Sequence, residues 1–142
     1  MDHVVYTDAK SQEMEKILKG EKTMIIRGAT GRKLPYGKVN TGDCLYLINN
    51  NGEGTVKASC RVKSVFNSDK MSKEESMKLV ADNALKLNLS ESQYSKWAGK
   101  RYIVLIEIDS ANEVTSLRID KSKYSNMDDW LPVVDIESVK IK

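Results

Sequence analysis

Histidine and cysteine are scarce in this 142-residue chain, which has one histidine and two cysteines. Zinc sites use four nitrogen or sulfur ligands at short spacings, and His3, Cys44 and Cys60 are too few and too far apart to supply them. Asp128 and Asp129 are adjacent, but an isolated acidic pair is more often part of a solvated loop. We therefore predict no metal and no cofactor.

The chain also lacks a long apolar run and a leader pattern. No stretch approaches the roughly 18 apolar residues that a membrane-spanning helix needs. The first residues, Met-Asp-His-Val-Val-Tyr, have neither the basic patch nor the apolar segment of a secretory signal. Both cysteines are isolated in apolar, strand-like settings, which favours buried free thiols over a disulfide. These absences predict a cytoplasmic protein without membrane association. The sequence also has no exposed apolar stripe, so we expect no obligate protein partner.

Positive charge is concentrated in one part of the sequence. The net charge of the chain is only +3. Seven basic residues and one acidic residue lie between Lys16 and Lys38, which gives this stretch a charge of +6 and the remainder −3. Such asymmetry points to anionic ligands, nucleic acid among them, although lysines that only solvate a loop would give the same count.

A short helix leads into the basic stretch. Met14, Ile17 and Leu18 repeat at helical spacing after a possible N-cap at Asp8. Gly20 can end this helix because it tolerates the left-handed conformation. Residues 22–27 then have the composition of a strand, and residues 28–38 form a glycine-rich basic loop. The loop is not a nucleotide phosphate loop, since no Ser or Thr follows Lys33.

The rest of the chain alternates strands with two helical inserts. Asn51-Gly52 predicts a hairpin turn, and Ser72 with Glu75 and Ser90 with Gln93 match the capping box of a helix start. The expected strands are residues 3–6, 44–49, 55–63, 101–108, 114–119 after a turn at 111–112, and 138–141, with helices over 73–87 and 91–97. This order predicts one α+β domain spanning residues 1–142, with a small, curved, mostly antiparallel β-barrel and inserted helices.

The basic stretch resembles the ASCH domain, a family of the PUA-like superfamily of small β-barrels. The resemblance is carried by a helix, then Gly20-x-Lys22, a strand ending in Arg27, a loop, and Thr-Gly-Asp at 41–43 before a buried strand. It extends from the helix ending at Lys19 to the strand ending at Ile108. It implies a PUA-like barrel that binds RNA or a nucleotide in a cleft beside Gly20-x-Lys22.

The match to the family pattern Gly-x-Lys-x-x-Glu-x-Arg has one departure, since Ile25 stands where the glutamate would be. A bacterial branch of this family hydrolyses the acetyl amide of N4-acetylcytidine with a lysine, a threonine and a glutamate. Lys22 matches the lysine, but Ile25 occupies the threonine position and has no hydroxyl. The glutamate position falls near Leu85. The resemblance thus favours binding over this hydrolysis.

Lys22, followed by Thr23, is the first candidate ligand residue. Its amine could contact a phosphate or a base edge, or be activated by desolvation, and the alternative is a solvated lysine at a strand start. Arg27 could bind a phosphate with its forked guanidinium. An internal salt bridge to Asp43 or Glu107 would explain Arg27 equally well.

Aromatic and basic residues of the loops complete the candidate site. Arg32 and Lys33 would attract an anionic ligand, or would only solvate the loop. Tyr36 and Trp130 are candidates for stacking on a base, with core packing as the alternative for Trp130. For Trp97, which closes a helix, core packing is favoured.

The sequence therefore predicts an RNA- or nucleotide-binding module whose cleft uses Lys22, Thr23, Arg27, Arg32, Lys33, Tyr36 and Trp130. The alternative is a hydrolase acting on a modified nucleoside or RNA, with Lys22 as the central catalytic group. The missing threonine and glutamate separate the two hypotheses, while other acids such as Asp43 leave a rebuilt catalytic site open.

Overall fold

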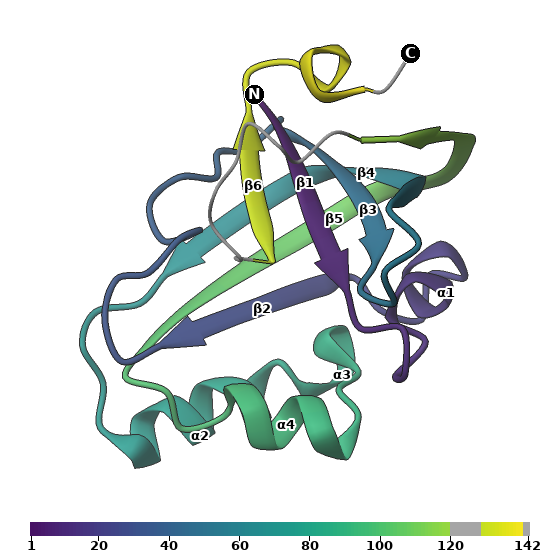
Figure 1. Ribbon diagram of the computed structural model, residues 1–142. Coiled ribbons are helices and arrows are strands. Elements are labelled where there is room, and N and C mark those ends of the chain that lie inside the picture. The colour runs from purple at the N-terminus through teal and green to yellow at the C-terminus, as the bar shows by residue number, and fades with distance from the viewer. Residues whose placement is uncertain (120–128, 141–142) are drawn as a thin grey trace.

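The computed structural model describes residues 1–119 and 129–140 (Figure 1). In chain order its elements are β1 (Asp2–Thr7), α1 (Glu13–Leu18), β2 (Met24–Ala29), β3 (Cys44–Asn49), β4 (Thr55–Asn67), α2 (Lys73–Asp82), α3 (Ala84–Leu87), α4 (Glu91–Trp97), β5 (Tyr102–Arg118), β6 (Trp130–Val133) and a 3₁₀ helix (Ile136–Val139). No helix among the described residues is both long enough and apolar enough to cross a membrane.

Within the described residues, six strands form one sheet in the order β2-β5-β4-β3-β1-β6. Neighbouring strands pair antiparallel except β1 and β3, which run parallel. The sheet curls into a half-barrel, and α2, α3 and α4 gather on one side of β2 (Figure 1). The predicted α+β architecture with a curved, mostly antiparallel sheet and inserted helices is confirmed.

Strand β2 is buried on both faces, which suits its largely apolar residues. Ile25 packs into the core inside the half-barrel, whereas Met24 and Ile26 pack against the core formed with the helices. Side chains alternate along a strand, so Arg27 lies on the same face as Ile25. A charged side chain is thereby directed into the interior of the half-barrel, where it is only 5% exposed.

Local sequence signals fixed several boundaries correctly. Ser72 with Glu75 and Ser90 with Gln93 both form complete capping boxes at the starts of α2 and α4. The hairpin between β3 and β4 turns at the predicted Asn51-Gly52, where Gly52 has a φ of 86°. Each of these signals depends on contacts between residues close in sequence, so the local pattern is sufficient to predict it.

Other boundaries differ from the prediction. The polar stretch at 111–112 is no turn, because β5 continues to Arg118 alongside the long strand β4 and takes up the irregularity as shifts in register. The helix expected over 73–87 is interrupted at Asn83. Asp8 caps the turn before α1, which starts only at Glu13. The strand expected at 138–141 is replaced by the 3₁₀ helix and a bridge between Lys140 and Ile119, and Ile141 lies outside the described residues.

A buried chain of polar side chains joins β1, β6 and the start of β3. Trp130 Nε1 donates to His3 Nδ1 at 3.0 Å, and His3 Nε2 lies 2.8 Å from Asp43 Oδ2. Indole nitrogen is only a donor, so Nδ1 must accept, and the ring proton therefore lies on Nε2 and is donated to Asp43. Asp43 also accepts a hydrogen bond from the Asn40 backbone amide and forms an ion pair with the amino group of Met1.

We expect Asp43→Ala to lower the free energy of unfolding by about 2–3 kcal/mol, because the His3 and Asn40 donors lose their acceptor. Burial alone raises the pKa of Asp43, but the hydrogen bonds from His3 and Asn40 hold this pKa below its ordinary 3.8. The stabilisation is therefore complete above about pH 4 and is lost as the pH falls below that value. Urea unfolding at pH 7 and pH 3 measures it, with exposed Asp69→Ala as the control. Equal stability of Asp43→Ala and wild type at pH 7 would contradict this role.

Candidate functional site

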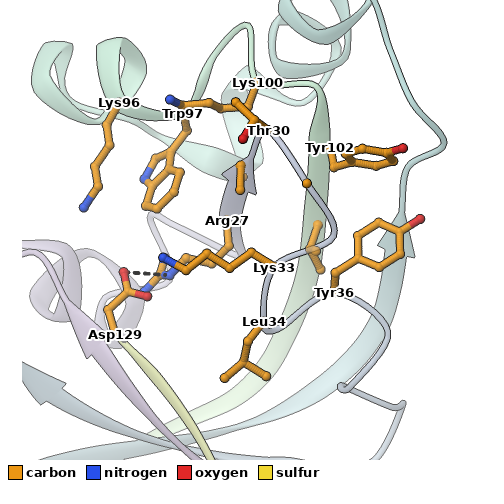
Figure 2. A pocket seen from close by; sticks show the side chains of 14 residues that line it. Arg27, Thr30, Lys33, Leu34, Tyr36, Lys96, Trp97, Lys100, Tyr102 and Asp129 are labelled. Carbon is orange, nitrogen blue, oxygen red and sulfur yellow. Dashed lines mark ion pairs between the residues drawn. The ribbon is translucent and has the colours of Figure 1, made fainter. Parts of the chain in front are cut away.

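A cleft of about 540 Å³ opens beside the end of β2. Its walls come from the loop after β2, the end of α4, the start of β5 and the residue before β6 (Figure 2). The lining residues are Arg27, Gly28, Ala29, Thr30, Gly31, Lys33, Leu34, Tyr36, Lys96, Trp97, Lys100, Tyr102, Val104 and Asp129. Segments far apart in the sequence thus converge on one concave surface, which we call the cleft.

Arg27 lies in the cleft between the two edges of the curled sheet. Its Nη2 donates to the Tyr6 carbonyl of β1 at 2.8 Å, and its Nη1 donates to the carbonyl of Ile26 at 2.8 Å. Its Nε lies 3.2 Å from Asp129 Oδ2. The strands β2 and β6 are the two edges of the sheet, and among the described residues no backbone ladder joins them. The Arg27 side chain connects these two sides of the sheet instead.

The Arg27 guanidinium is also packed between two indoles. Its Cζ lies 5.5 Å from the ring centroids of both Trp97 and Trp130. The Nε–H makes no hydrogen bond, so the contact with Asp129 is an ion pair without the directed bond that would satisfy this donor. The internal salt bridge considered for Arg27 therefore exists, but with Asp129 instead of Asp43 or Glu107. Arg27 keeps positive charge and an unsatisfied donor in the cleft.

Aromatic rings flank Arg27 on both sides of the view in Figure 2, with Trp97 on one side and Tyr36 and Tyr102 on the other. Tyr36 and Tyr102 meet edge to face with centroids 5.8 Å apart. The Arg32 guanidinium lies 5.6 Å from both of these rings. Lys96 Nζ lies 4.7 Å from the Trp97 centroid, so cations accompany every aromatic ring of the cleft.

Of the predicted site residues, the structure brings Arg27, Lys33 and Tyr36 together in the cleft and places Arg32 against Tyr36. Trp130 has no exposed surface, so it offers no face for stacking on a ligand. Its hydrogen bond to His3 and its packing against Arg27 explain why it is buried. The expectation of a stacking role for Trp130 is therefore corrected.

Lys22 and Thr23 do not line the cleft. Lys22 is 1% exposed, donates to the Leu87 carbonyl and lies 3.7 Å from Glu13 Oε2. Both residues border a separate cavity of about 170 Å³. The cleft therefore lies beside the Arg27 end of β2, whereas Gly20, Lys22 and Thr23 border the separate smaller cavity. Lys22 is directed instead between α1 and α3, where it neutralises a buried carboxylate.

The surroundings of Lys22 change its acidity. Burial lowers the pKa of Lys22 from 10.5 to about 8, against the opposing effect of Glu13, and nearby Arg27 lowers it further. An amine with this pKa is partly neutral in mildly basic solution. The Leu87 carbonyl and Glu13 nevertheless enclose it, so its altered acidity is a consequence of packing rather than of contact with the cleft.

Four of the cationic and aromatic lining residues were not in the predicted site: Lys96, Trp97, Lys100 and Tyr102. A signal for them existed in the polar segment after Trp97, where a helix ends and a strand begins. It did not show that this segment lies opposite the loop after β2, since that depends on how α4 packs on the sheet. Among the described residues, no group of three His, Cys, Asp or Glu side chains could hold a metal ion.

The curled six-stranded sheet with these helices makes the chain a small α+β protein, and solved ASCH proteins share its fold. The crystal structure of ASCH from Zymomonas mobilis aligns with 96% of this chain and 90% of that chain, with a TM-score of 0.67 and 15% sequence identity. A serine-to-alanine variant and a tyrosine-to-phenylalanine variant of that protein each align with a TM-score of 0.68 and 15% identity, over 96% of this chain and 91% and 93% of theirs. No family model and no curated protein sequence matches the chain. The expected ASCH resemblance is thus confirmed at the level of the fold.

We expect Lys22→Met to destabilise the protein by about 3 kcal/mol at pH 7, because Glu13 would remain buried without its partner. The stability difference between wild type and Lys22→Met should grow from about pH 8 to pH 10.5. In this range the unfolded chain keeps a proton that folded Lys22 has released, so rising pH favours the folded state by up to about 1.4 kcal/mol per pH unit.

Chemical denaturation across this range measures the difference. Exposed Lys19→Met is the control and should stay parallel to wild type at every pH. If the stability difference between wild type and Lys22→Met stayed the same at every pH, the folded protein would not hold the Lys22 amine out of water.

Proposed function

We propose that the cleft binds a nucleotide-like anion, such as a nucleotide of RNA. The observation that carries this proposal is the convergence of aromatic rings and cations on one concave surface. Among the described residues that line the cleft, Asp129 is the only acid, and it is already paired with Arg27. A ligand with a flat ring and a negative charge complements such a surface, because the ring stacks while the charge is neutralised.

Trp97 is the main candidate for stacking. It is half-buried and lines the cleft, whereas Trp130 is fully covered. A base against an indole is stabilised without sequence-specific contacts, since every base has an aromatic face. The cations next to Trp97, Arg27 and Lys96, would strengthen the attraction to the phosphate of the same nucleotide.

The phosphate contacts would come from exposed basic side chains. Lys33 and Lys96 are exposed and Lys100 is half-buried, and all three line the cleft. Arg27 supports them as a fixed positive charge, because two of its nitrogens are already engaged by carbonyl oxygens. This arrangement supports salt-dependent, sequence-tolerant binding rather than base-specific hydrogen bonding.

The alternative, hydrolysis centred on Lys22, has weaker geometric support. The amine is enclosed beside Glu13 and does not border the cleft, and Ile25 lacks a hydroxyl. A carboxylate that acted as the general base of hydrolysis in the cleft would have to be free to move a proton. Asp129, the one lining carboxylate, is held in the ion pair with Arg27. Binding therefore remains the proposal that the site supports better.

We expect Trp97→Ala to weaken binding of a uridine mononucleotide and of a short RNA by about 1–3 kcal/mol, because one base loses its stacking partner. Fluorescence anisotropy with labelled RNA and calorimetry with the mononucleotide measure the loss. Trp97→Phe should restore part of the affinity.

Tyr94→Ala is a matched control, because Tyr94 is an exposed aromatic residue of α4 that does not line the cleft. It should bind as wild type does. Undiminished affinity of a folded Trp97→Ala variant, or no detectable binding by wild type at low salt, would refute the proposed function.

A further inference from the structure

A second hollow, of about 610 Å³, adjoins the cleft. It is lined by Thr30, Lys70, Met71, Ser72, Lys73, Gly99, Lys100 and Arg101. Thr30 and Lys100 border both spaces. The two hollows are therefore neighbours with Thr30 and Lys100 at their common border, and we call the two together the groove. Figure 2 shows Thr30 and Lys100 together at one margin of the cleft.

The second hollow is strongly cationic. Lys70, Lys73, Lys100 and Arg101 line it, and no acid does. Within residues 1–119 and 129–140, none of these four side chains forms an ion pair with a carboxylate. Four uncompensated charges around one hollow repel one another in the absence of a bound anion, so a polyanion would relieve this repulsion as it binds.

The walls of the second hollow are held in place by hydrogen bonds. The Met71 amide donates to the Arg101 carbonyl at 3.0 Å, and the Ser68 amide donates to the Ile103 carbonyl at 2.9 Å. Tyr36 of the cleft donates its hydroxyl proton to the Ser68 carbonyl at 2.5 Å. The contact of Tyr36 with Ser68 therefore links a wall of the cleft to the segment that leads into the second hollow.

Two glycines make room for the lysine stems. A Cβ at Gly28 would lie 3.1 Å from Lys100 Cβ, and a Cβ at Gly99 would lie 3.4 Å from Lys73 Cγ. Gly99 also has a φ of 89°, which other residues rarely adopt. The aliphatic parts of Lys100 and Lys73 are thereby packed on the backbone, so these side chains lose less freedom when they bind a ligand.

We propose that the groove binds a single-stranded oligonucleotide, with one nucleotide in the cleft and the phosphate of the adjoining nucleotide in the second hollow. This inference rests on the proposed function of the cleft. A mononucleotide would occupy the cleft and leave the charges of Lys70, Lys73 and Arg101 uncompensated. A strand repeats a phosphate at every nucleotide and so neutralises both hollows at once.

The test compares a uridine mononucleotide with a uridine tetranucleotide, as RNA and as DNA, on the full chain. The double variant Lys70→Ala/Lys73→Ala should weaken tetranucleotide binding by about tenfold and reduce its dependence on salt, by about 0.7 in the logarithmic slope for each lost contact. Mononucleotide affinity should not change. Gly28→Ala, which displaces Lys100, should weaken binding of both ligands, because Lys100 borders both hollows.

The control is Lys57→Ala/Lys78→Ala, which removes the same charge from two lysines outside the groove that pair with Glu53 and Asp82. It should bind the tetranucleotide about as tightly as wild type, and so about tenfold more tightly than the Lys70→Ala/Lys73→Ala variant. Equal weakening by both double variants would overturn the proposal in favour of general charge attraction. If wild type binds the mononucleotide and the tetranucleotide with equal affinity, the proposed role of the second hollow is overturned while the proposed function of the cleft stands. If wild type does not bind the mononucleotide, the proposed function itself is overturned. Preference for the RNA or DNA tetranucleotide identifies which strand is the ligand.

Discussion

The guanidinium of Arg27 is the contact on which the half-barrel and its cleft both depend. It connects β2 to β1 through the Tyr6 carbonyl and to the β6 side through Asp129. In the sheet order β2 is the first strand and β1 and β6 are the last two, so a side chain completes what a backbone ladder would complete in a closed barrel. The cleft lies at this junction because the loop after β2 and the end of α4 are left on either side of it.

A buried charge at the junction needs support from other polar groups. Trp130 packs on Arg27 and is itself oriented by His3, whose ring is fixed by Asp43. The amino-terminal strand, the start of β3 and β6 thus position the interior side of the cleft through one continuous set of contacts. Replacement of a partner in this set would leave a donor or a charge unsatisfied in the interior, which costs more than the loss of a surface contact.

Lys22 and Arg27, two basic residues of one short segment, have different structural roles. Lys22 is enclosed with Glu13, where burial lowers its pKa to about 8. Arg27 remains charged at the floor of a solvent-accessible cleft. A guanidinium tolerates this position because it combines carbonyl contacts with stacking on two indoles, which an ammonium group cannot do equally well. The more exposed basic side chains are the lysines around the cleft and the second hollow.

The sequence by itself determined the features that depend on near neighbours: the capping boxes of Ser72 and Ser90, the hairpin at Asn51-Gly52, a strand following Lys22 and the basic loop after it. Together with the Gly20-x-Lys22 and Arg27 pattern, these were sufficient to predict the fold. Only the tertiary structure decided which tryptophan borders the cleft, which acid pairs with Arg27, and that Lys22 is enclosed. The reason is that these outcomes depend on how far the sheet curls and where α4 packs on it, and such long-range geometry is not encoded in the spacing of residues along the chain.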